Sequence, residues 1–268
     1  MTPNVNFVSN LQAGNFVFDG AYVQGVLSQQ ALPTGPATNF TAIVGAGSWG
    51  IPNRVLTASG PQGALLAVGR KTSVKASAYS AAIDASPECN QFKFVRVTDG
   101  TDVAAKINLV DTATPTPANV LILTAACTGS DGNLGSARID LASGTATASP
   151  VYNITIYDPF GGTTVYKNIP GFSTAGGPYV ATAFQANALA AINGTAPNST
   201  ANPYYIATAG TSTIAPVTGQ ASLAMGSGGT DGDSGVTDTM LIGTDAQAAS
   251  TGMYVLRGSI AGGQLVLA

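Results

Sequence analysis

The 268-residue sequence contains no histidine. This absence excludes catalytic triads and dyads that depend on an imidazole base, and it excludes metal sites built from imidazole ligands. Acid/base chemistry by lysine, aspartate or glutamate remains open. Cysteine is nearly absent too, because Cys89 and Cys127 are the only two, too few for a disulfide scaffold or a four-thiolate zinc site. We expect two buried free thiols, and a single disulfide is the alternative.

Charge is equally scarce, since only 9% of the residues are charged and the net charge is −3. In globular chains, roughly a quarter of the residues are usually charged. The sequence has no basic run, so nothing indicates nucleic-acid binding. No apolar run approaches the roughly 18 residues that would predict membrane insertion, and residues 1–10 do not resemble a signal peptide. Weak charge repulsion favours association with other subunits.

The pattern that remains predicts an α+β fold. Apolar runs and alternation predict strands, and 3.6-residue spacing with capping residues predicts helices. The expected strands are 40–44, 92–97, 120–125, 136–141, 151–157, 163–166, 204–208, 254–257 and 265–267. The expected helices are 61–69, 72–85 with Ser73 as its cap, 179–192 and 236–250.

The first thirty residues predict an extended arm, because their apolar residues follow no helical period. Such a segment cannot bury its own side chains and needs a neighbour in the same chain or in another subunit. The residues that we expect to add to a neighbouring subunit as strands are Val5, Phe7, Phe16, Phe18, Tyr22 and Val23.

The stretch GSGGTDGDSG at 226–235 permits three interpretations. Its GDSG resembles the nucleophile loop of a serine protease, but Ser234 has no histidine partner and every lysine precedes it. Asp231, Asp233 and Asp238 resemble calcium ligands, but Gly235, Val236 and Ile242 break the EF-hand pattern. A flexible loop with Asx-turns and an Asp or Thr cap for the next helix is the interpretation we favour.

A second glycine-rich run, GAGSWG at 45–50, matches the spacing of a dinucleotide-binding loop after a strand. Pro52 disfavours a helix at this point, and the next acidic residue, Asp84, is too far away to bind a ribose. We therefore expect a glycine turn beside closely packed backbone, and no cofactor site.

Several segments in order resemble the tail sheath proteins of contractile bacteriophages and R-type pyocins. The matching segments are FDGAYV at 18–23, TAIVGAGSWG at 41–50, RVLTAS at 54–59, FVRV at 94–97, TAACTGSDGN at 124–133, AAIN at 190–193 and GGTDG at 228–232. Each match is short, but the order and spacing together are fairly specific. Asp19-Gly20 stands where Pro-Gly is usual in the family, and the low charge is a further departure.

The resemblance implies an α/β sheath core with an inserted β-rich outer domain and an extended N-terminal arm. The corresponding boundaries are 1–30 for the arm, 31–99 and 223–268 for the two parts of the core, and 100–222 for the insertion. Because sheath chains usually continue well beyond the GGxDG helix, we expect that the core is incomplete here and that the sequence is part of a longer protein.

The resemblance also implies a structural role in the virion, without catalytic, metal or cofactor sites. Subunits would assemble in the host cytoplasm into a helical homo-oligomer around the tail tube protein, between baseplate and tail terminator proteins. Contraction would drive the tube through the host envelope for genome ejection.

Two other classes of function stay open at this point. One is a virion decoration or host-binding module, in which the region 100–222 contacts host glycans. The other is an enzyme, such as a glycosidase, that uses two carboxylates. The chain has 13 acidic residues and no paired acidic motif, which disfavours the enzyme.

Overall fold

The computed structural model describes residues 12–18, 21–27, 40–70, 77–87, 89, 91–143, 148–197, 199–246, 249–259 and 264–268. The chain divides into two compact units, Met1–Asn39 and Phe40–Ala268. Helices and sheets are both present, so the fold class is α+β, as the sequence predicts. No helix within the described ranges is long and apolar enough to cross a membrane.

The first unit contains a two-stranded antiparallel sheet of β1 (Gln12–Phe18) and β2 (Ala21–Leu27). Phe16 pairs with Val23, and Val17 pairs with Tyr22. The strands are extended, as expected, but they pair with each other as a hairpin. Val5 and Phe7 lie outside the described residues.

The second unit begins with a four-stranded sheet, which we call the core sheet. Its order is β13-β3-β5-β4, in which β13, β3 and β5 are parallel and β4 is antiparallel to β5. Its strands are β3 (Phe40–Gly45), β4 (Val55–Ser59), β5 (Gln91–Arg96) and β13 (Gln264–Leu267). All residues of β3 are buried, which explains its continuous apolar run.

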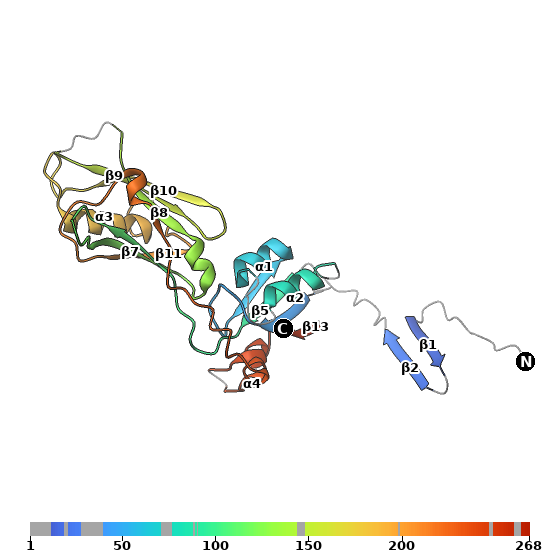
Figure 1. The fold of residues 1–268 in the computed structure, drawn as a ribbon. Helices are drawn as coiled ribbons and strands as arrows, with labels where there is room; N and C mark the ends of the chain where they lie inside the picture. Colours follow the sequence, from blue (N-terminus) through green and yellow to red (C-terminus); the bar gives the residue numbers. More distant parts are fainter. Residues whose placement is uncertain are drawn as a thin grey trace, which may run out of the picture. The chain divides into compact units, whose positions relative to one another are not determined.

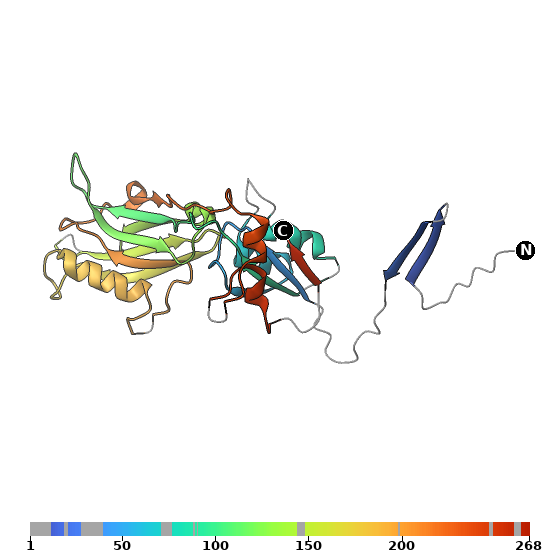
Figure 2. The same ribbon diagram turned by 90° about the horizontal axis from the view of Figure 1, so that it is seen from below.

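Both faces of the core sheet are covered by short helical elements. Helices α1 (Gly60–Val68) and α2 (Ala78–Ala85) pack on one face against Ile43, Phe92 and Phe94. The 3-10 helix η3 (Gly252–Leu256) and helix α4 (Asp238–Ile242) contribute Leu256 and Leu241 to the other face. Figure 2 shows these two groups on opposite sides of the sheet.

Two further antiparallel sheets and α3 (Ala181–Ile192) share one hydrophobic core. We call this region of two sheets and one helix the sandwich. The first sheet has the order β11-β7-β6, and the second has the order β10-β9-β8-β12. Helix α3 packs beside β10 and β11 (Figure 1). The strands are β6 (Lys106–Val110), β7 (Asn119–Ala125), β8 (Ser136–Leu141), β9 (Val151–Tyr157), β10 (Thr163–Pro170), β11 (Tyr205–Ala209) and β12 (Ala224–Met225). The 3-10 helices η1 (Ser130–Leu134) and η2 (Gly219–Ser222) lie between them in sequence.

Alternation along these strands explains the core of the sandwich. Ile107 and Leu109 in β6 are buried, and their neighbours Lys106 and Asn108 are exposed. On α3 the residues that face this core follow helical spacing: Phe184, Ala188 and Ile192. The strands that we predicted at 120–125, 136–141 and 151–157 are confirmed. β6 was not predicted, because its alternation covers only five residues.

The start of the second predicted helix is wrong. We expected a helix from 72 with Ser73 as its cap; Ser73 lies outside the described residues, and α2 begins at Ala78 after Ser77, whose backbone is extended. The hydroxyl oxygen of Ser77 accepts a hydrogen bond from the backbone N–H of Ser80 at 3.2 Å, which is the geometry of an N-cap. A second serine in the same stretch therefore has the role that we assigned to Ser73.

The end of the chain differs from the prediction in two elements. The helix expected at 236–250 is only α4, because Gly243 has a φ of 75° and its N–H caps the carbonyl of Thr239. The strand expected at 254–257 is the 3-10 helix η3. In a 3-10 helix, residues three apart lie on the same side. Met253 and Leu256 can therefore both pack against this face of the core sheet, which favours the 3-10 conformation.

Candidate functional site at the Arg96 junction

The glycine-rich stretch at 226–235 returns the chain from the sandwich to the core sheet. It runs antiparallel to residues 99–106, which lead outward, with Val103 bridged to Thr230 and Lys106 bridged to Ser227. The N–H of Asp99 also donates to the carbonyl of Gly232 at 2.7 Å. The two connections thus form a ribbon, which we call the double linker.

Arg96, the last residue of β5, is completely buried at the base of the double linker. Its guanidinium donates to five oxygens from three other parts of the chain. These are the carbonyls of Gly47 (2.8 Å), Gly50 (2.5 Å), Thr128 (2.8 Å) and Asp231 (2.8 Å), and the hydroxyl of Thr128 (2.7 Å). A planar guanidinium with five donors suits such a cage, which an ammonium with three donors would leave partly unsatisfied.

The charge of Arg96 is balanced by carboxylates around the cage. Burial lowers the pKa of the Arg96 guanidinium, and the negative charges of Asp102 and Asp231 oppose this shift most strongly. Asp231 also accepts a hydrogen bond at 2.6 Å from the N–H of Ser130, at the start of η1. Its side chain therefore joins the double linker to the sandwich.

A second contact between the core-sheet region and the sandwich involves Arg70, which follows α1. Asp131 accepts a hydrogen bond from the N–H of Arg70 at 2.8 Å and forms an ion pair with its guanidinium at 3.2 Å. The same guanidinium donates to the carbonyl of Pro159 at 3.0 Å and lies 5.6 Å from the ring centre of Phe160. Phe160 in turn packs edge-on against Trp49 at 5.7 Å.

The run at 45–50 is a turn beside packed backbone, as expected. A Cβ atom on Gly47 would lie 2.5 Å from the carbonyl oxygen of Val68, so only glycine fits there. Gly129 approaches the same turn from the sandwich with a φ of 129°, and a Cβ atom on it would lie 2.0 Å from the carbonyl oxygen of Ser48. These glycines permit the backbones of the two regions to touch.

The acidic residues Asp231, Asp233 and Asp238 differ in their exposure to solvent. Among the described residues, no group of three or more His, Cys, Asp or Glu side chains has the geometry to hold a metal ion. Asp233 is buried, whereas Asp238 is exposed in the first turn of α4. Thr237 occupies the N-cap position of α4, but its side chain makes no capping bond there, contrary to our expectation.

Both cysteines are thiols, as expected, but Cys127 is less deeply buried than predicted. Cys89 is buried and its thiol donates to the carbonyl of Gln91 at 2.9 Å. Cys127 is half-buried, and burial raises the pKa of its thiol. A raised pKa favours the protonated thiol, which is the less reactive form.

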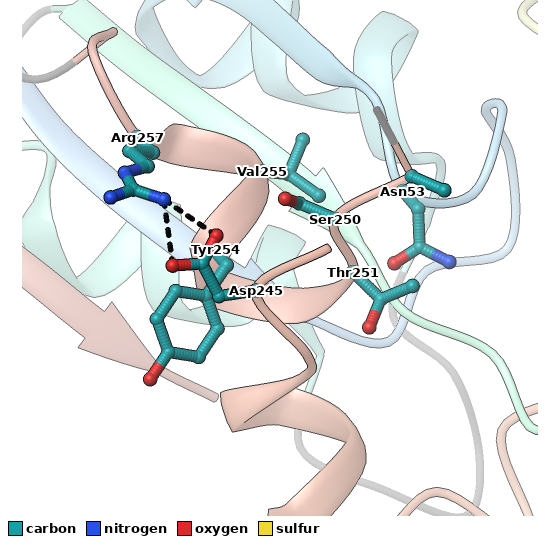
Figure 3. A pocket seen from close by; sticks show the side chains of 8 residues that line it. Asn53, Asp245, Ser250, Thr251, Tyr254, Val255 and Arg257 are labelled. Atoms are coloured by element: carbon teal, nitrogen blue, oxygen red, sulfur yellow. Dashed lines mark hydrogen bonds and ion pairs between the residues drawn. The ribbon is translucent and has the colours of Figure 1, made fainter. Parts of the chain in front are cut away.

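A separate cavity of about 740 Å³ lies between the turn after β3 and the segment from α4 to η3 (Figure 3). Asp245 and Arg257 form an ion pair across it at 2.6 Å, with 70% of the Arg257 side chain exposed. The lining residues are Asn53, Asp245, Ala249, Ser250, Thr251, Tyr254, Val255 and Arg257. Sequence analysis singled out none of these as site residues.

The predicted strand-exchange residues all fall in the first unit of the chain. Phe16, Phe18, Tyr22 and Val23 belong to the hairpin of the first unit. Their role between subunits stays a prediction. The sequence did contain a signal for the junction, because Arg96 is a charged residue directly between Val95 and Val97 in a chain that is poor in charge.

Comparison with family models and with curated proteins yields no match. Among solved structures, the chain is similar to the sheath tail protein from Desulfitobacterium hafniense, with 15% identity, a TM-score of 0.44, and coverage of 75% of this chain and 37% of that chain. It is also similar to a sheath tail protein from Listeria innocua, with 16% identity, a TM-score of 0.44, and coverage of 72% and 34%. The chain thus spans little more than a third of the length of either protein.

Proposed function

We propose that this chain is a structural subunit of a contractile phage tail sheath and that it works without catalysis. One observation carries the proposal. Four segments that resemble the sheath family, 41–50, 94–97, 124–133 and 228–232, are far apart in sequence but meet at the guanidinium of Arg96. Short matches that arise by chance have no reason to converge on one buried cage.

The composition supports the same proposal. A subunit that is surrounded by copies of itself needs few charges, and this chain has few. Contacts between different surfaces of identical subunits generate open helical assemblies. In the proposed sheath, these assemblies surround the tail tube protein in the virion, and the contracted lattice buries more surface than the extended one.

In the proposed mechanism, the N-terminal segment connects subunits. A two-stranded hairpin is marginally stable by itself and gains stability when a third strand adds to it. Main-chain hydrogen bonds between strands make little demand on sequence, so the hairpin can hold a neighbour while rings rotate. Phe16, Phe18, Tyr22 and Val23 are the described residues to which we assign this role.

Deletion of residues 1–25 tests this mechanism. We expect that the shortened chain keeps a cooperative melting transition, because Phe40–Ala268 is a compact unit of its own, but that it no longer forms tubes. Negative-stain electron microscopy of both chains is the measurement. Normal tubes from the shortened chain would contradict the role of the hairpin.

The same micrographs separate the proposed function from its alternative. Long hollow cylinders from the full chain support a sheath, whereas discrete particles favour a decoration or host-binding module. A glycan-array measurement on the full chain then tests whether the region 100–222 recognises host sugars.

A further inference from the structure

Two groups of contacts, each centred on an arginine, join the sandwich to the core sheet at the junction. The first is the cage around Arg96, where the guanidinium joins the turn at 47–50, Thr128 of the sandwich and Asp231 of the double linker. The second is the contact of Arg70 with Asp131 and the β9–β10 turn.

Without these contacts, the connection would be a hinge. The double linker is a two-stranded ribbon that carries the chain outward after Val97 and back before Val236, and a ribbon of this kind twists and bends easily. Both groups of contacts involve the turn at 47–50, because the hydroxyl of Ser48 donates to the carbonyl of Arg70 at 2.9 Å and the carbonyl of Ser48 accepts from the N–H of Asp131 at 3.1 Å. Together they oppose bending and twisting of the ribbon.

The hydrogen bonds of Arg96 must all form together, because water cannot replace any of them while the guanidinium stays buried. The guanidinium is 0% exposed, so it cannot exchange its protein acceptors for water while it stays in place. If the sandwich moved, Thr128 and Asp231 would withdraw their oxygens and leave a buried charge with unused donors. A buried unpaired charge is strongly unfavourable, so small rotations are penalised from the start.

We propose that Arg96 is a positioning residue that fixes the orientation of the sandwich on the core sheet and couples the unfolding of the two. The inference concerns the single subunit and does not depend on the proposed function. If subunits move relative to one another in an assembly, we expect the movement at the surfaces of Phe40–Ala268 and at the hairpin, and no bending of the double linker.

Arg96→Met tests the proposal, because methionine occupies part of the volume without donors or charge. Spin labels at Asp84→Cys in α2 and Thr163→Cys in β10, both exposed positions, report the distance between the two regions in a Cys89→Ala, Cys127→Ala background. Measurements use the full chain in dilute solution. We expect one narrow distance distribution with Arg96 and a broad one with Arg96→Met.

Thermal unfolding of the same proteins gives the second readout. We expect that one transition becomes two and that the lower transition falls by roughly 10 °C, as for the loss of a partner in a buried ion pair. Ile154→Val, deep in the sandwich and away from the junction, is the matched control. It should lower the melting temperature slightly and leave the distance distribution narrow.

Three results would overturn the proposal: a broad distribution already with Arg96, a narrow one in folded Arg96→Met, or equal broadening by Ile154→Val. If Arg96→Met does not fold, Arg96→Lys decides, because lysine keeps the charge but supplies three donors in place of five. Broadening with Arg96→Lys supports the proposal, and an unchanged distribution contradicts it.

Discussion

Asp111 shows how one residue links the stability of the sandwich to pH. Its side chain is 2% exposed and accepts hydrogen bonds from the hydroxyl of Ser212 at 2.5 Å and from the N–H groups of Ala113 and Ala118. These bonds, that of Ser212 above all, hold the pKa of Asp111 below its usual value. Because the folded-state pKa is the lower one, the stabilisation is complete above about pH 4 and is lost as the pH falls further.

We expect that Asp111→Asn lowers the melting temperature at pH 7 and flattens its decrease in acid. Asp84→Asn, at an exposed position, is the control, and an unchanged acid profile in Asp111→Asn would refute the assignment.

At the scale of the element, α2 depends on the cap at Ser77. We expect that Ser77→Ala lowers the free energy of unfolding by about 1 kcal/mol, because the N–H of Ser80 loses its acceptor. Urea denaturation measures this loss. Ser73→Ala is the informative comparison, since the sequence pattern favours Ser73 as the cap. An equal loss in Ser73→Ala would contradict the assignment of Ser77 as the cap of α2.

At the scale of the whole molecule, the scarcity of charge predicts how assembly responds to salt. With 9% charged residues and a net charge of −3, few ion pairs are available to hold subunits together. Salt screens exposed pairs strongly, so for the proposed sheath we expect tube yield and length to change little between about 50 and 500 mM NaCl. Light scattering and electron microscopy at both salt concentrations measure this. Dissolution of the tubes at high salt would show that ion pairs dominate the interfaces.

The contrast between predicted and observed elements is clearest where local and distant forces differ. β3 and the strands at 120–125, 136–141 and 151–157 could be predicted, because a buried strand must be apolar or alternate along its own length. η3 could not, because its conformation follows from a sheet face that strands far away in sequence build. The helix that begins at Asp238 ends at Gly243, although apolar residues continue in the sequence beyond that glycine.

By itself, the sequence determined which sites these 268 residues cannot form, since the absence of histidine removes imidazole-dependent sites whatever the fold. It also determined the α+β class and most strands of the sandwich, because hydrophobic spacing is a local property. Only the tertiary structure decided the role of Arg96. The four carbonyl groups that surround it come from residues 47 to 231, and carbonyl groups leave no trace in the sequence. A buried guanidinium could be suspected from its apolar neighbours, but its partners exist only once the chain has folded.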